Sequence, residues 1–291
     1  MLFDVIVGNP PYQGVKSTSG TQGKPPTIWP KFIEIADDHL KSDGVLVMVH
    51  PAMYRKVGNK LQDIILNNTR QLHMYNNAEA MQTFGASTRY DWYVVDKTYN
   101  GSTEVYFEDL SHKTLDLSPG MFLPNGSWDV WNKVINAGPQ LKTIKRPDSP
   151  DDMGDFDVIQ TLTKTKGVVV RKTSKTPKSY GIKKVILSET GCQALYDKDG
   201  KYGTTSNCYY VKVESDCEGQ SLVRFVSSNL CDHLVESCKW GNFRVESCIW
   251  NFIAAPWNLG ITSESTEEEI NQAYGVCADD IRFIYGQNRN K

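Results

Sequence analysis

FDVIVGNPPY, residues 3–12, is the stretch that decides how this 291-residue chain is interpreted. Its first half, FDVIVG, is a short apolar run rich in β-branched residues, which is typical of a strand buried on both faces. Its second half holds two consecutive prolines, which fix their own φ angles and keep the preceding residue extended. A rigid polar turn directly after a buried strand indicates a ligand site at the carboxyl end of that strand.

The composition is that of an ordinary globular protein, and its net charge of −2 argues against a uniformly basic nucleic-acid binder. Any contact with nucleic acid would need a local basic patch. No apolar run approaches the ~20 residues of a membrane span, and the N-terminus lacks the flanks of a signal peptide, so we expect a cytoplasmic protein. The seven cysteines all lie beyond position 190 without a CxxC pair, which argues against a disulfide framework and a zinc site.

Strands and helices alternate along the first hundred residues. Apolar spacing predicts strands over 3–8, 44–51, 70–76 and 90–98, helices over 28–41 and 55–68, and a loop over 79–89. This alternation predicts an α/β fold with a parallel, doubly wound sheet. A hairpin over 102–119 and a helix over 127–138 follow, the helix with Asn125 or Ser127 as its cap.

A segment rich in Pro, Asp and Gly, residues 146–155, is expected to link two domains, 1–147 and 155–291. The second region has an α+β pattern. Its predicted elements are strands over 158–162, 167–172, 183–188 and 208–213, a helix over 220–238, and two short helices within 266–286 broken at Gly275.

The turn itself suggests a chemistry. The amide oxygen of Asn9 and the carbonyl oxygen of Pro10 are two hydrogen-bond acceptors held at a fixed spacing. Such a pair suits one planar amino group with two hydrogens, and Tyr12 adds an aromatic face on which the same ligand can stack. Hydrogen bonds of this kind would favour a tetrahedral, more nucleophilic nitrogen. The turn therefore predicts a pocket for the exocyclic amine of a base.

FDVIVGNPPYQ resembles motif IV of the adenine-N6 DNA methyltransferases that use S-adenosylmethionine, in the branch associated with type II restriction-modification enzymes. Later segments resemble the same family in the same order. Residues 26–51 are similar to its next helix and strand, and 81–97 to its motif VIII. Residues 198–211 and 238–244 are similar to its target-recognition region, and 266–284 to its acidic C-terminal signature.

The resemblance implies a partial doubly wound, Rossmann-like methyltransferase sheet followed by an α+β target-recognition domain. It also implies that double-stranded DNA is the substrate and that the target adenine is flipped out of the stack. The implied catalytic residues are Asn9, Pro10, Pro11 and Tyr12, and the implied base-stacking residues are Tyr12 and Phe84. No metal is implied, because methyl transfer by direct displacement depends on positioning.

A basic segment follows the linker. No acidic residue occurs between Asp157 and Glu189, and this interval holds Lys164, Lys166, Arg171, Lys172, Lys175, Lys178, Lys183 and Lys184. We expect these side chains to contact DNA phosphates, the alternative being a solvated basic face.

The family's cofactor motifs precede motif IV, whereas only eight residues precede Asn9 here. We therefore expect that S-adenosylmethionine is the cofactor but that its main binding motif is absent from this chain. A second subunit that carries the cofactor-binding half is one explanation. A catalytically inactive DNA-binding descendant and a shortened gene product are the others. In each case the strand FDVIVG would present a long apolar edge that has to be covered.

Overall fold

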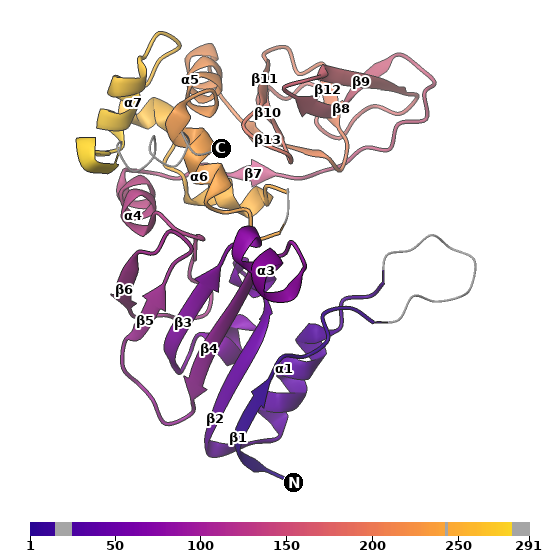
Figure 1. The fold of residues 1–291 in the computed structure, drawn as a ribbon. Helices are drawn as coiled ribbons and strands as arrows, with labels where there is room; N and C mark the ends of the chain where they lie inside the picture. Colours follow the sequence, from indigo (N-terminus) through magenta and orange to yellow (C-terminus); the bar gives the residue numbers. More distant parts are fainter. Residues whose placement is uncertain (15–24, 242–243, 281–291) are drawn as a thin grey trace. The chain divides into compact units, whose positions relative to one another are not determined.

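The computed structural model of the protein describes residues 1–14, 25–241 and 244–280. The packing of the chain divides it into two compact units (Figure 1). The first unit is Met1–Gly126 with Trp240–Asn242, and the second is Ser127–Lys239 with Phe243–Lys291. The predicted linker over 146–155, between domains 1–147 and 155–291, stays a prediction.

The first unit is built around a six-stranded sheet with the strand order β1-β2-β4-β3-β5-β6. Its elements are β1 (Phe3–Gly8), α1 (Trp29–Asp38), β2 (Leu40–Pro51), η1 (Ala52–Arg55), α2 (Gln62–Ile65), β3 (Thr69–Tyr75), α3 (Asn77–Phe84), β4 (Tyr90–Asp96), β5 (Thr103–Tyr106) and β6 (His112–Leu115). All four predicted strands of the first hundred residues and the predicted hairpin, β5–β6, are confirmed.

The sheet is mixed, so the prediction of a wholly parallel sheet was wrong. Strand β1 pairs with β2 in parallel, and β3 pairs with β5 in parallel. Strand β4, however, lies between β2 and β3 and runs antiparallel to both. The chain returns from β3 to β4 through the short helix α3, and a short connection of this kind places the next strand antiparallel beside the previous one.

One helix prediction and one loop prediction were also wrong, and local backbone chemistry explains both. Of the helix predicted over 55–68, the structure forms only the short α-helix α2, because Gly58 adopts a left-handed conformation with φ of 80°. The predicted loop over 79–89 contains most of α3. A capping box between Asn76 and Glu79 starts this helix, and Gly85 ends it in a left-handed conformation.

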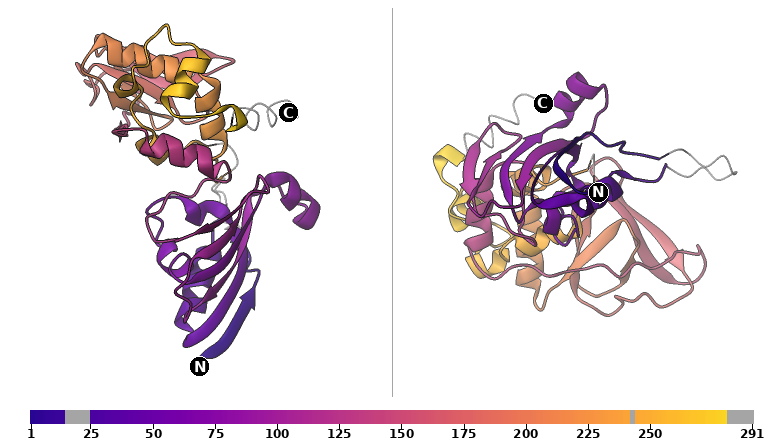
Figure 2. Two further views of the ribbon diagram at one scale, coloured as in Figure 1. Left: turned by 90° about the vertical axis from the view of Figure 1, so that its left-hand side faces the viewer. Right: turned by 90° about the horizontal axis from the view of Figure 1, so that it is seen from below.

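Strand β1 is an edge strand rather than a strand buried on both faces. Helix α1 covers one face of the sheet beside it, where Ile33 and Leu46 are fully buried. Among the described residues no strand pairs with the outer edge of β1, and Val5 and Val7 are 58% and 72% exposed. The expected uncovered apolar edge is thus present, and Figure 2 shows β1 at the margin of the sheet.

A short segment far along the chain belongs to the first unit. Trp240 is buried, and its indole nitrogen donates a 2.7 Å hydrogen bond to the carbonyl oxygen of Leu123. The carbonyl oxygen of Gly241 accepts a 3.4 Å hydrogen bond from the guanidinium of Arg89. This pair of residues therefore contributes to the core of a unit that is otherwise formed by the first 126 residues.

The second unit combines two small sheets with helices. The strand orders are β11-β10-β13-β7, which is antiparallel throughout, and β12-β8-β9, in which β12 and β8 are parallel. Its elements are α4 (Trp128–Asn136), β7 (Thr143–Ile144), β8 (Phe156–Thr163), β9 (Gly167–Thr173), β10 (Lys184–Ser188), β11 (Ala194–Asp197), β12 (Tyr202–Thr204), β13 (Cys208–Lys212), α5 (Asp216–Val226), α6 (Asn229–Glu236), η2 (Ser247–Phe252), η3 (Pro256–Leu259) and α7 (Glu267–Ala273).

The four predicted strands of this region correspond to β8, β9, β10 and β13. The single helix predicted over 220–238 is two helices, because the hydroxyl of Ser228 accepts from the amide of Cys231 and begins α6 anew. Ser127 precedes α4, but its side chain does not cap that helix and instead hydrogen-bonds His233 at 2.7 Å. The short helix predicted after Gly275 extends past residue 280 and lies partly outside the described residues.

Within the described ranges, no helix has the length and apolar character that crossing a membrane would require.

Candidate functional site

The turn Asn9–Tyr12 leaves β1 at its carboxyl end and borders a groove. Asn9 is exposed and Pro10 is buried, and both line a groove of about 560 Å³ between β1 and α1. The other lining residues are mostly apolar: Phe3, Val5, Ile6, Val7, Gly8, Phe32, Ile35, Ala36, His39 and Met48. The two predicted amine acceptors therefore lie at the end of an apolar groove that the described residues line without a carboxylate.

Backbone contacts hold the turn in place. The carbonyl oxygen of Tyr12 accepts from the amide of Ile28 at 3.2 Å, and the amide of Gly14 donates to Pro26 at 2.8 Å. Gly8 precedes the turn where a Cβ atom would lie only 3.1 Å from the sulfur of Met48. The turn is thus fixed by its prolines, by these hydrogen bonds and by close packing against β2.

The side chain of Tyr12 is half-buried, and its hydroxyl oxygen is buried without a hydrogen-bond partner among the described residues. Burial raises the pKa of Tyr12, and the neighbouring Tyr90 adds to this shift. A buried hydroxyl without a partner is unusual in a native protein.

An aromatic cluster surrounds Tyr90, the first residue of β4. The ring of Tyr75 stacks on Tyr90 with centroids 4.8 Å apart and planes 4° from parallel. Phe84 contacts the same ring edge-on at 4.9 Å, and the Tyr90 hydroxyl lies 3.5 Å from that of Thr83. Phe84 is 40% exposed while Tyr90 is buried. Of the two predicted base-stacking residues, Phe84 contacts Tyr90, which the sequence had identified only as a strand residue.

A buried network of charged side chains flanks Tyr90. The guanidinium of Arg55 binds both carboxylate oxygens of Asp91, with an Nε–Oδ2 distance of 2.8 Å, and donates to Asn125 at 2.8 Å. Glu108 lies 3.5 Å from Arg55 and 2.9 Å from Arg89. Burial raises the pKa of Glu108, although both arginines oppose the rise. No sequence motif marked this network, because the residues that contact Arg55 are 36 to 70 positions from it.

Half of the predicted basic residues of the second unit are paired with carboxylates. Arg171 pairs with Asp152, Lys172 with Asp157 at 2.8 Å, and Lys183 with Asp216 at 2.6 Å. Asp157 and Lys172 are cross-strand partners in the β8–β9 ladder. Acidic side chains from other parts of the chain therefore lie beside the basic segment, although its own sequence has none.

Lys184 is the clearest departure from the predicted DNA-contacting set. Its ammonium group is fully buried and binds Asp197 at 2.6 Å, together with the carbonyl oxygens of Ser179 and Ile182. Burial lowers the pKa of Lys184, and Asp197 opposes this shift. A buried, fully hydrogen-bonded lysine has a structural role, so it is not available to a phosphate.

Four members of the set remain exposed without an acidic partner in the described parts of the chain: Lys164, Lys166, Lys175 and Lys178. The ammonium of Lys178 donates to the carbonyl oxygen of Pro147 at 2.6 Å. Lys164 and Lys166 lie in the connection between β8 and β9, and Lys175 and Lys178 follow β9. These four are the lysines of the segment that a phosphate can reach without displacing a carboxylate.

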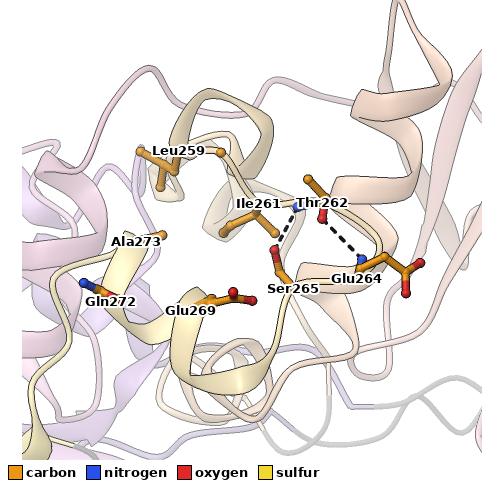
Figure 3. Close-up of a pocket in the computed structure, with 9 residues that line it drawn as sticks. Leu259, Ile261, Thr262, Glu264, Ser265, Glu269, Gln272 and Ala273 are labelled. Carbon is orange, nitrogen blue, oxygen red and sulfur yellow. Dashed lines mark hydrogen bonds between the residues drawn. The ribbon is translucent and has the colours of Figure 1, made fainter.

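A second hollow, of about 510 Å³, lies between η3 and α7 (Figure 3). Its rim is held by its own hydrogen bonds, from the amide of Thr262 to Ser265 and from the amide of Glu264 to Thr262. Glu269 caps α7 through Thr266. The acidic residues here start a helix, as the sequence indicated, and none of the predicted site residues lines this hollow. In the described part of the chain no three His, Cys, Asp or Glu side chains are placed to hold a metal ion.

Comparison with known proteins gives one family match. A sequence model of the Eco57I restriction-modification methylase family matches residues 1–84. The structure is similar to that of the Type IIL restriction-modification enzyme MmeI in complex with DNA, at 9% identity and a TM-score of 0.46, covering 97% of this chain and 54% of that chain. It is also similar to the type IIG restriction endonuclease BpuSI, at 12% identity and a TM-score of 0.33, covering 98% and 54%.

This chain therefore spans about half the length of each of these two enzymes. No curated protein matches its sequence. The match to residues 1–84 covers β1, the Asn9–Tyr12 turn and the helix α3 that ends at Phe84. This part of the chain is similar to the Eco57I restriction-modification methylase family.

Proposed function

We propose that this chain is part of a site-specific DNA methyltransferase that transfers a methyl group from S-adenosylmethionine to the N6 amine of a flipped adenine. The observation that carries the proposal is the rigid Asn9–Tyr12 turn at the carboxyl end of β1, inside the region that matches the methylase family. Residues 1–147 would form the later half of the catalytic domain, and residues 155–291 the target-recognition domain.

In this proposal the turn binds the adenine amine. The amide oxygen of Asn9 and the carbonyl oxygen of Pro10 accept its two hydrogens, and Pro11 keeps these acceptors rigid. Tyr12 and Phe84 stack on the extruded base, which offsets the few kcal/mol that leaving the duplex costs. The hydrogen bonds localise the lone pair on nitrogen. S-adenosylmethionine supplies the methyl group, and a proton leaves the amine as the new bond forms.

The residues that line the groove suit only part of S-adenosylmethionine. The groove beside Asn9 and Pro10 offers an apolar wall, but none of its described lining residues is acidic. A carboxylate is the usual partner of ribose hydroxyls in nucleotide-binding α/β folds. A second subunit would therefore supply the main cofactor-binding half.

The exposed edge of β1 also supports the proposal of a second subunit. Val5 and Val7 are exposed on this strand, and its outer edge carries one charged residue, Asp4. Natural edge strands are normally protected by charges, prolines or a covering element. A partner that adds a strand beside β1 would bury this surface and bring the cofactor to the groove.

Lysine contacts to phosphate complete the proposal. Lys164, Lys166, Lys175 and Lys178 are the proposed first contacts to double-stranded DNA. Arg171, Lys172 and Lys183 would join them only after exchanging an aspartate for a phosphate.

The test is transfer of a labelled methyl group to unmethylated bacterial DNA, by the chain alone and with the product of the neighbouring gene. Digested DNA is analysed by mass spectrometry, and N6-methyladenosine is the expected product. Asn9→Ala should lower the rate of its formation by about 10²–10³-fold. Methylation of cytosine, or none under either condition, would contradict the proposal.

A second candidate function, a catalytically inactive DNA-binding protein, is favoured by the lack of a carboxylate among the described residues of the groove. A salt-dependent gel shift that persists in Asn9→Ala and Tyr12→Ala, with no methyl transfer by the wild-type protein, would identify it.

A further inference from the structure

We propose that Cys192 and Cys231 form a site of reversible oxidation in the second unit, where a hydroperoxide converts the two thiols into a disulfide. This bond would tie the connection between β10 and β11 to helix α6. The inference goes beyond the proposed function, because neither cysteine belongs to the Asn9–Tyr12 turn or to the predicted phosphate contacts. Its test therefore needs neither DNA nor methyl transfer.

The first observation is a direct contact between the two thiols. Folding brings Cys192 and Cys231 together from positions 39 residues apart, and their sulfur atoms lie 3.6 Å from each other. A disulfide bond is about 2.0 Å long, so the two sulfur atoms must approach by about 1.6 Å. Rotation about the Cα–Cβ bond of one cysteine moves its sulfur through distances of this size. A pair that only folding creates leaves no CxxC motif in the sequence.

The second observation is that the two thiols have different surroundings. Cys192 is partly exposed and lies between β10 and β11, outside both strands, whereas Cys231 is fully buried in the first turn of α6. Burial raises the pKa of Cys231 well above its usual value, so this thiol stays protonated near neutral pH. Cys192 is therefore the thiol that meets an oxidant first, and Cys231 is the thiol that completes the disulfide.

The third observation is a small hollow that gives an oxidant access to Cys192. Its volume is about 290 Å³, and its lining comes from the β8–β9 hairpin, the β10–β11 connection and α6. Cys192 lines this hollow together with polar side chains that include Gln193 and Asp232. A water molecule takes up about 30 Å³ in the liquid, so the hollow has room for hydrogen peroxide.

The oxidation proceeds in two balanced steps with hydrogen peroxide as the oxidant. The thiolate sulfur of Cys192 attacks one peroxide oxygen, the O–O bond breaks, and the leaving hydroxide takes the proton that the thiol gave up. Cys192 is then a sulfenic acid, and the first water has formed.

In the second step the sulfur of Cys231 attacks the sulfur of Cys192. The S–O bond breaks, and the hydroxide that leaves takes the thiol proton of Cys231 as the second water. The two sulfur atoms together lose two electrons, which the peroxide has gained. A protonated thiol attacks slowly in solution, but here the contact with Cys192 replaces a bimolecular encounter.

The first measurement maps disulfides in the full chain after treatment with hydrogen peroxide. The remaining thiols are alkylated in denaturant, and the chain is digested with trypsin without reductant. The expected product is a linked pair of peptides, 185–198 with Cys192 and 225–239 with Cys231. Treatment with dithiothreitol should separate the two peptides again.

A matched control lies in the same tryptic peptide. Cys238 is fully buried like Cys231, and both occur within 225–239. Cys231→Ala should abolish the linked pair, whereas Cys238→Ala should leave its yield unchanged. Cys192→Ser should also abolish the link, and as a change at a partly exposed position it tests the proposal even if Cys231→Ala does not fold.

Two exposed cysteines, Cys217 and Cys277, show whether peroxide has reacted with the protein. The proposal is overturned if these two are oxidised while Cys192 and Cys231 remain thiols. It is also overturned if Cys192 is oxidised to a sulfinic acid without forming the link. In urea the contact is lost, so Cys192 should then join the other cysteines about as often as Cys231.

The second measurement tests whether the bond restrains the β10–β11 connection. Hydrogen exchange of residues 189–193 should slow by about threefold or more after oxidation, because a cross-link to α6 suppresses local opening. Dithiothreitol should reverse the change, and Cys192→Ser should not show it. Unchanged exchange in the cross-linked protein would contradict the proposed restraint. These results are independent of whether the protein transfers a methyl group.

Discussion

The Asn9–Tyr12 turn and the basic segment 164–184 both contain predicted functional residues, but different kinds of interaction fix their conformations. Covalent restriction by two prolines, backbone hydrogen bonds and close packing against β2 fix the turn. Exchangeable ion pairs to Asp152, Asp157 and Asp216 hold much of the basic segment. The turn is therefore expected to keep its geometry in any salt, whereas the segment is expected to change its partners when a polyanion arrives.

The largest expected effect tests the rigidity of the first unit. Arg55→Met leaves Asp91 buried without its cation, which should cost about 3–5 kcal/mol of unfolding free energy. Urea denaturation followed by circular dichroism measures the loss. Arg70→Met removes an exposed arginine that pairs with Asp96 and should cost under about 1 kcal/mol. Similar losses in the two variants would mean that the buried network does not stabilise this unit.

The next effect concerns the turn itself. Asn9→Ala removes one proposed amine acceptor and should lower kcat for adenine methylation by about 10²–10³-fold, as loss of an aligned hydrogen-bond partner does in other enzymes. DNA affinity, measured by gel shift, should stay within about twofold, because Asn9 touches no phosphate in the proposal. A parallel loss of DNA affinity would mean that the turn binds DNA rather than the reacting base.

The third effect depends on pH and again concerns the first unit. His50 is fully buried, stacks on Trp29, and has its pKa lowered from 6.5 to about 4 by burial. The unfolded chain then binds more protons between these values, so this stabilisation is present above pH 6.5 and is lost as the pH falls toward 4. Unfolding free energy should drop by about 2–3 kcal/mol between pH 7 and 4.5 from this group.

Two histidine variants separate this effect from general acid destabilisation. His50→Gln should flatten that part of the pH profile in urea titrations. His39→Gln, which alters an exposed ring at the end of α1, should leave the profile as it is. An unchanged slope in His50→Gln would show that other groups cause the acid sensitivity.

The smallest effects test the second region. Replacing Lys164, Lys166 and Lys175 by Gln should weaken binding to duplex DNA. It should also reduce the salt slope by up to about one unit for each of these lysines that binds a phosphate in the wild type. The matched variant replaces Arg171, Lys172 and Lys183 by Gln. It should weaken binding less, because these cations must first give up an aspartate. Equal effects would mean that the ion pairs do not restrain the segment.

The sequence predicted the elements of the first unit best where local chemistry is decisive. The strand FDVIVG and the turn after it were placed correctly, because β-branched residues and prolines restrict the backbone directly. The direction of β4 was predicted wrongly, since it depends on how β3, α3 and β4 close together rather than on the pattern of any one of them. The prediction of a helix over 55–68 was wrong because of one residue, Gly58, whose left-handed conformation interrupts a helix.

The residues of the candidate site also fall into two groups, those that sequence motifs could identify and those that only the folded structure brings together. Asn9, Pro10, Pro11, Tyr12 and Phe84 were chosen from motifs, and their catalytic and stacking roles stay predictions. Tyr90 and Arg55 could not be found from the sequence, because their importance comes from partners brought together only by folding. The burial of Lys184 could not be foreseen for the same reason: its ion-pair partner Asp197 is 13 residues away on the neighbouring strand.

The return of Trp240 and Gly241 to the first unit has a consequence for how such a protein can be rebuilt. The polypeptide passes between the two units three times, at 126–127, 239–240 and 242–243. A recombinant that exchanges everything after residue 126 would also exchange the indole that binds Leu123 and the carbonyl that Arg89 contacts. A different second region can be joined to the first unit only if it brings, or is given, the Trp-Gly pair that packs in that unit.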